Sequence, residues 1–90
     1  MTVENMESSN GNAIPNQFII HDDNGNVFFQ SYKSIIVKID RKNDKTYLDS
    51  RYWDYSKTTG KYRNQFLGEN KEETKKKIDQ GIYILCNLNL

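Results

Sequence analysis

The dipeptide Asn24-Gly25 constrains the fold of this chain more than any other feature of its sequence. It stands between two short segments rich in apolar, β-forming residues, at 18–22 and 27–32. Asn followed by Gly favours a type I′ turn, because both residues tolerate the positive φ that this turn requires. We therefore expect a tight antiparallel hairpin at this place and an antiparallel sheet built around it.

Two further segments continue the predicted sheet. Ile35, Val37 and Ile39 fall on one face of the segment 34–40, which is the two-residue period of a half-buried strand. No turn residues separate this segment from Tyr32, so we expect a bulge there or one long curved strand. A polar turn then leads into a strand at 46–49. These segments predict a meander of three to four antiparallel strands.

The pattern changes to helix after the meander. Ser56 is the predicted N-cap of a helix that runs to about Leu67, with Gly68 as its left-handed terminator. Asn70 is the predicted N-cap of a second helix, and Glu73 stands where a capping box needs it. Both helices are short.

An alternating segment at 82–88 follows the second helix and predicts a buried closing strand. The fold class is therefore α+β: an antiparallel β-sheet meander of three to four strands, two short helices and a closing C-terminal strand. Residues 1–15 are polar, show no strand or helix period and end at Pro15, so we expect a disordered leader. Residues 16–90 then form a single α+β domain, since 90 residues leave no room for a second core. A homodimer paired through the strand at 35–39 stays open.

Composition excludes several classes of protein. The 13 Lys and Arg nearly balance the 12 Asp and Glu, which argues against a strongly charged mimic of a polyanion. A single cysteine, Cys86, and a single histidine, His21, exclude a disulfide scaffold and a zinc finger. The longest apolar stretch, 82–86, is too short to cross a membrane, so we expect a soluble cytoplasmic protein without membrane contact.

Residues that could carry catalysis are sparse. His21 and Cys86 are a weak basis for a nucleophilic pair, because the cysteine lies in an alternating apolar segment where a thiol usually packs. Asp49, Asp54 and Glu73 could serve as ligands in a metal-dependent nuclease. The spacing of the aspartates is not that of a calcium loop, however, and Glu73 falls inside a predicted helix, so solvated turn and helix charges are the favoured explanation. We therefore expect no enzyme activity, no catalytic residue, no bound metal and no cofactor.

Basic and aromatic residues gather around the junction between sheet and helices. No Lys or Arg precedes residue 26, so the helical part is the positive end of the molecule. Trp53, Tyr62 and Phe66 are expected in the core between sheet and helices, whereas Tyr52 and Tyr55 have charged neighbours and are expected at the surface. The predicted binding residues are Arg51, Tyr52, Tyr55, Lys57, Lys61, Arg63, Lys75, Lys76 and Lys77.

Two interpretations of this basic region stay open. Two short helices joined by a tight turn resemble a helix-turn-helix, whose second helix would enter a DNA groove and whose lysines would contact phosphates. Alternatively, the lysines neutralise their own helix through the pairs Glu72 with Lys76 and Glu73 with Lys77, four residues apart with the acid first.

Three stretches carry a resemblance to known sequences: YLDSRYWDYSKTT at 47–59, KYRNQFLG at 61–68, and Glu73-Thr74 to Ile78 followed by Gly81. They resemble small uncharacterised proteins of phages and plasmids from low-GC Gram-positive bacteria, over about residues 28–88. The resemblance implies a mobile element as the setting and carries over no functional residue.

Together these observations predict a non-enzymatic binding protein of a mobile element that inhibits a host macromolecule by covering its surface. A defence nuclease is the expected target, as for an anti-CRISPR protein. The alternative is a small DNA-binding accessory protein that contacts phosphates through the basic helical pair. The expected partner is thus a host protein, such as a CRISPR effector nuclease, or a nucleic acid.

Overall fold

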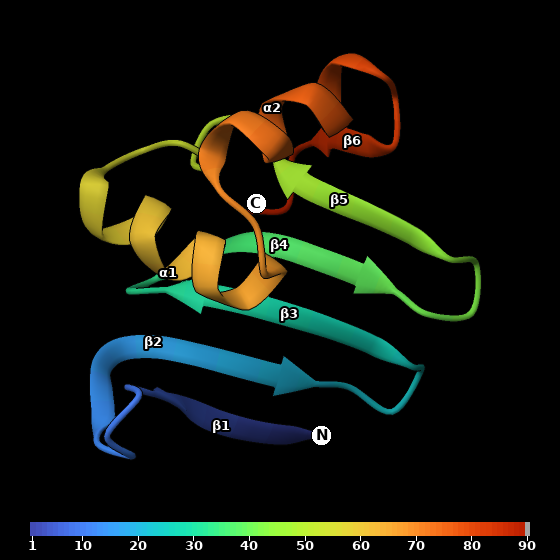
Figure 1. The fold of residues 1–90 in the computed structure, drawn as a ribbon. Helices are drawn as coiled ribbons and strands as arrows, with labels where there is room; N and C mark the ends of the chain where they lie inside the picture. The colour runs from blue at the N-terminus through green and yellow to red at the C-terminus, as the bar shows by residue number, and fades with distance from the viewer. Residues whose placement is uncertain (90) are drawn as a thin grey trace.

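A computed structural model describes residues 1–89 as a single sheet with two helices on one of its faces (Figure 1). The strands lie in sequence order across the sheet; β1 to β5 run antiparallel to their neighbours, and β6 pairs with β5 in parallel. The elements are β1 Thr2–Glu7, β2 Ala13–His21, β3 Asn26–Ser31, β4 Ser34–Asp40, β5 Lys45–Asp49, α1 Lys57–Leu67, α2 Lys71–Asp79 and β6 Tyr83–Cys86. The α+β class is confirmed, with a broader and mixed sheet.

The core lies between the helices and the sheet. Phe29 on β3 is fully buried and stacks on Phe66 of α1, with ring centroids 5.6 Å apart. Val37 and Leu48 are equally buried beside Phe29 on the central strands. Burial of apolar surface of this kind is the main favourable contribution to folding. The contact between Phe29 and Phe66 therefore fixes the position of α1 on the sheet, including its first turn, which contributes to the surface site described below. None of the helices in residues 1–89 is long and apolar enough to span a membrane.

The helix boundaries agree closely with those predicted from capping. The Ser56 side chain accepts a hydrogen bond from the backbone N–H of Thr59, and Gly68 ends α1 in the left-handed conformation with φ of 70°. Asn70 and Glu73 form the complete capping box of α2. Trp53, Tyr62 and Phe66 pack against the core as expected.

The N-terminal segment corrects the expectation of a disordered leader. Thr2–Glu7 forms the edge strand β1, which pairs with β2 and buries Met6 to 3% exposure. The Asn5 side-chain amide donates a hydrogen bond to the backbone carbonyl of Ile14, at 2.8 Å. An edge strand needs few apolar residues, because much of it faces water, so its polar composition concealed it. Residues 2–7 therefore belong to the folded domain, which was predicted to start at residue 16; its predicted end, Leu90, lies outside the described residues.

Two turns differ from their predicted form. The β2–β3 hairpin is present, but only Gly25 has a positive φ, and the Asp22 carboxylate closes the loop by accepting from the backbone N–H of Asn24 and Asn26. A type I′ turn is therefore wrong. Between β3 and β4, neither a bulge in the turn nor a continuous strand occurs: Tyr32 adopts φ of 57° in a two-residue connection. A bulge occurs instead inside β4, where the register with β3 shifts between Phe29 and Gln30.

The C-terminal strand is less buried than predicted. Tyr83 is 8% exposed, whereas Ile84 and Leu85 are 37% and 41% exposed, because β6 is an edge of the sheet. Its parallel pairing follows from the two-helix connection, which returns the chain to the end of the sheet where β5 began. The strand predicted to pair across a dimer axis, β4, lies between β3 and β5 and has no free edge.

Candidate functional site

The loop between β5 and α1 is held in shape by one buried carboxylate, Asp49. Its side chain is 1% exposed and accepts hydrogen bonds from the backbone N–H of Arg51 at 3.1 Å, Tyr52 at 2.8 Å and Leu88 at 2.8 Å. Burial opposes ionisation of Asp49, but these backbone donors outweigh it, so the pKa of the carboxyl lies below its ordinary value. Asp49 thus fixes the backbone that presents Arg51 and Tyr52.

A cleft of about 480 Å³ opens beside this loop. We call it the tyrosine cleft, because Tyr32, Tyr52 and Tyr55 line it, with Ile36 and Thr59 among the other contributors. The rings of Tyr52 and Tyr55 meet edge to face, with centroids 5.2 Å apart. Tyr55 is 69% exposed, as predicted for a surface residue, whereas Tyr52 is half-buried and also packs against the core.

Tyr32 belongs to the cleft although no sequence pattern pointed to it. Its φ of 57° and that of Asn16, 64°, are both left-handed conformations that side chains other than Gly adopt at a cost of about 1 kcal/mol or more. The backbone N–H of Tyr32 donates to the carbonyl of Asn16 at 2.7 Å, which links the two strained positions. The Gln30 side-chain amide also donates to the Tyr32 carbonyl. These contacts hold one wall of the cleft in a defined position.

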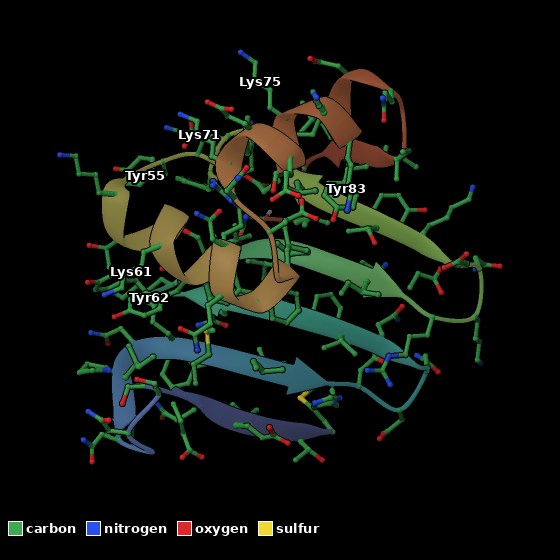
Figure 2. The ribbon with its side chains drawn as sticks, viewed as in Figure 1. Tyr55, Lys61, Tyr62, Lys71, Lys75 and Tyr83 are labelled. Atoms are coloured by element: carbon green, nitrogen blue, oxygen red, sulfur yellow. The ribbon has the colours of Figure 1, made fainter. Side chains whose placement is uncertain are left out.

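A second, shallower cleft of about 600 Å³ lies on the other side of the α1 N-terminus. We call it the cationic cleft, because Lys57, Lys61, Arg63 and Lys71 line it with a single carboxylate, Asp54. Ser56 lines both clefts. Figure 2 shows Tyr55 and Lys61 around α1, with Lys71 at the start of α2.

Arg63 was predicted to be a binding residue at the surface, but it is buried: its side chain is 1% exposed. It donates to the Trp53 carbonyl and, at 2.9 Å, to the Asn64 side chain, and its guanidinium lies over the Trp53 ring, 5.3 Å from the centroid. Asp54 approaches at 3.6 Å. Burial lowers the pKa of Arg63, and Asp54 opposes that shift. The Nε atom of Arg63 has no partner among the described residues.

Two lysines of α2 also have carboxylate partners, and one of them, Lys77, is a predicted binding residue. Lys71 lies 2.7 Å from Asp54, and Lys77 lies 2.7 Å from Glu69. The Glu69 carboxylate also accepts from Thr74 at 2.6 Å and from the Tyr83 hydroxyl at 2.9 Å. Burial opposes its ionisation, but the hydrogen bonds, from Lys77 first, keep the pKa of Glu69 below its ordinary value.

The pairing of Lys77 corrects the expectation that it pairs with Glu73, because the Glu73 side chain is used in the capping box of α2. The remaining predicted cations of the helices, Lys57, Lys61, Lys75 and Lys76, are exposed. Figure 2 shows Lys75 projecting from α2, far from Lys61. The structure therefore brings Tyr52, Tyr55, Lys57 and Lys61 to the two adjoining clefts and separates them from the predicted binding lysines of α2, Lys75, Lys76 and Lys77, which line neither cleft.

The residues considered for catalysis do not converge. Asp49, Asp54 and Glu73 serve respectively a loop, an ion pair and a helix cap. Within residues 1–89, no three His, Cys, Asp or Glu side chains lie close enough to share one metal ion. His21 on β2 and Cys86 on β6 are four strands apart, roughly 19 Å, so they cannot form a nucleophilic pair.

Fold and site define a small α+β protein with helices on one face of a mixed sheet and two adjoining surface clefts. The chain belongs to DUF8033, a family of unknown function, whose model matches residues 1–81. The matched region runs from β1 to the end of α2 and so contains both clefts. No curated protein and no solved structure matches the chain.

Proposed function

We propose that this chain is a non-enzymatic binding protein that inhibits a host macromolecule by covering part of its surface. The tyrosine cleft is the observation that carries the proposal. Tyrosines in a concave, rigid patch supply large contact area at low entropic cost, and such residues dominate the energy of protein interfaces. The cleft here is rigid on two sides, through Asp49 below the loop and the Tyr32–Asn16 hydrogen bond at the opposite wall.

A cationic rim lies beside the tyrosine cleft. Lys33 lines it directly, Arg51 lies over the Tyr52 ring at 5.4 Å from the centroid, and Lys57 and Lys61 lie across the α1 N-terminus. Rim charges of one sign raise the rate of association with a partner of the opposite sign. The partner surface is therefore acidic and presents an apolar or aromatic group to the cleft.

The proposed target is a defence nuclease of the host, of the CRISPR kind. The resemblance to small mobile-element proteins supports this choice, because small non-enzymatic proteins of mobile elements commonly bind either nucleic acid or a host defence or replication protein. The pairing of Arg63, Lys71 and Lys77 within the fold also favours a protein target, since it reduces the charge available for phosphates.

The proposal is tested by cleavage and pull-down assays with purified CRISPR nucleases and the full chain. Tyr55→Ala should weaken inhibition at least tenfold, because a buried aromatic anchor contributes about 2 kcal/mol or more at an interface. Tyr47→Ala is the matched control, because Tyr47 lies on β5, outside both clefts. An inhibitor that retains full potency with Tyr55→Ala, or the absence of inhibition across the nuclease panel, would contradict the proposal.

A second candidate function is supported by one observation: the lysines at 57, 61, 75 and 76 are exposed on the two helices. A small DNA-binding protein would use them on phosphates, and its affinity would then fall steeply with salt as counterions are released. Titration of labelled single-stranded and duplex DNA at two salt concentrations tests this. Absence of binding at low salt removes the candidate.

A further inference from the structure

The tyrosine cleft selects against cationic ligands. Three tyrosines could in principle enclose an ammonium group through cation–π contacts. The part of its lining that the structure describes contains Lys33 and no carboxylate, however, and Arg51 stacks on Tyr52 beside it. Positive charge on two sides repels a cation and favours a flat ring that is neutral or carries negative charge. The amide of Asn16 and the hydroxyl of Ser34 lie in the same lining and offer hydrogen bonds to the edge of such a ring.

The cationic cleft has capacity for an anion. Its one carboxylate, Asp54, is already shared by Arg63 and Lys71, which leaves Lys57 and Lys61 uncompensated among its lining residues. Arg63 adds a second, independent observation: its side chain is almost fully buried, and its Nε atom has no hydrogen-bond partner among the described residues. A buried donor without a partner is costly. The incompletely satisfied guanidinium also places a fixed positive charge in the wall of the cleft, which favours an anion there.

The two clefts meet at a single residue, Ser56. Ser56 lines both, and it is the N-cap of α1, where the helix dipole favours a negative group. A ligand that occupies both clefts must therefore carry an aromatic ring and an anionic group on one short scaffold. The tyrosine cleft, at about 480 Å³, falls in the size range of small-molecule sites.

We propose that the two clefts together bind one nucleotide unit, with the base among the tyrosines and the phosphate in the cationic cleft. The base stacks on the exposed ring of Tyr55, as bases do on the aromatic side chains of single-strand binding proteins, and meets the Tyr52 ring at its edge, because the two tyrosine rings stand edge to face. The phosphate lies over the α1 N-terminus against Lys57 and Lys61. This site concerns a small ligand of the isolated protein and holds whether or not a nuclease is the target.

The test is a calorimetric titration of the full chain at low salt with thymidine, thymidine 5′-monophosphate and inorganic phosphate. The nucleotide should bind at least tenfold more tightly than either part alone, because only it reaches both clefts. Equal affinities for nucleotide and phosphate, or no saturable binding up to about 10 mM, would overturn the proposal.

Variants separate the two halves of the site. Lys61→Gln should remove most of the advantage of the nucleotide over thymidine, and Tyr55→Ala should remove most of its advantage over phosphate. Lys75→Gln is the matched control, because Lys75 is an exposed lysine on α2 that lines neither cleft. A loss with Lys75→Gln as large as with Lys61→Gln would indicate non-specific charge attraction and contradict the site.

The source of the nucleotide is settled by a further arm, a short 5′-phosphorylated thymidine oligonucleotide. Tighter binding of the oligonucleotide than of the mononucleotide identifies the end of a nucleic-acid strand as the ligand. Equal or weaker binding identifies a free nucleotide. Both results support the site, and neither depends on the outcome of the nuclease assays.

Discussion

The cations of the two helices form two sets: those that are buried or paired within the fold, and those that are exposed to solvent. Arg63 is buried against Trp53 and Asp54, whereas Lys61, two residues earlier on α1, is exposed at the edge of the cationic cleft. Residues two apart lie about 200° apart around a helix, so one points into the fold when the other points out. Of these two basic residues close together in sequence, Arg63 therefore stabilises the fold and Lys61 is available to a ligand.

The largest difference between the two sets is expected in stability. Arg63→Met keeps much of the side-chain volume but leaves the Trp53 carbonyl without its donor and leaves Asp54 paired with Lys71 alone. We expect a loss of about 3 kcal/mol in the free energy of unfolding, at the lower end for a broken buried pair because Asp54 is 36% exposed. Lys61→Met, the matched control, should change it by less than about 0.5 kcal/mol. Urea unfolding measures the free energy of unfolding of both variants. Equal losses would contradict the assignment of Arg63 to the fold and of Lys61 to the exposed surface.

The next largest effect concerns the loop that carries Tyr52. Asp49→Asn replaces a charged acceptor of three backbone hydrogen bonds by a neutral amide, which should cost about 2 kcal/mol. Near-ultraviolet circular dichroism should report a changed environment of Tyr52. Asp44→Asn, at an exposed turn position, is the control and should leave stability and spectrum nearly unchanged. A loop that is unaffected by Asp49→Asn would show that other contacts hold it.

The same buried carboxylates predict how stability depends on pH. The pKa values of Asp49 and Glu69 are lowered in the folded state from ordinary values of 3.8 and 4.5. Their stabilising contribution is therefore fully present above those ordinary values and is lost as pH falls through the lower, folded values. Thermal melting between pH 7 and pH 2.5 should show a flat upper range and a decline that begins at about pH 4. Asp49→Asn should make that decline shallower, and an unchanged slope would contradict this role.

A smaller, stabilising change is available inside α1. Gly60→Ala should raise the free energy of unfolding by about 0.5 to 1 kcal/mol, because glycine is unfavourable within a helix. The added Cβ would lie 3.7 Å from the nearest Arg63 atom, an ordinary contact. Thermal melting measures the shift. Destabilisation would show that the Arg63 guanidinium needs the space that Gly60 leaves open.

The smallest effect is expected on α2. Lys76 is exposed, so Lys76→Gln should change the free energy of unfolding by only a few tenths of a kcal/mol. Lys77→Gln should cost more, because Lys77 pairs with the almost buried Glu69 carboxylate. Chemical unfolding of the two variants side by side measures the difference. If Lys76→Gln is the more costly, the expected pair of Glu72 with Lys76 matters more than the pair seen in the structure.

The predictions from sequence succeeded where a short segment contains its own hydrogen-bond partners. Ser56, Gly68 and the Asn70–Glu73 box marked the helix ends correctly, because capping joins residues at most four apart. The hairpin around Asn24-Gly25 was predicted in the correct place but with the wrong turn type, since the Asp22 side chain stabilises a longer loop. The strand β1 was missed because its exposed edge needs little apolar sequence.

The amino-acid sequence by itself determined the class of fold, the helix ends, the aromatic core residues at 53, 62 and 66 and the exposure of Tyr55. Only the tertiary structure decided that Tyr32 joins Tyr52 and Tyr55 in one cleft, and that Arg63 is buried while Lys61 is exposed. The physical reason is range. Caps and turns depend on neighbours in the chain, whereas the cleft depends on sheet order and on which face of α1 packs against β3, and these follow from burial of the whole core.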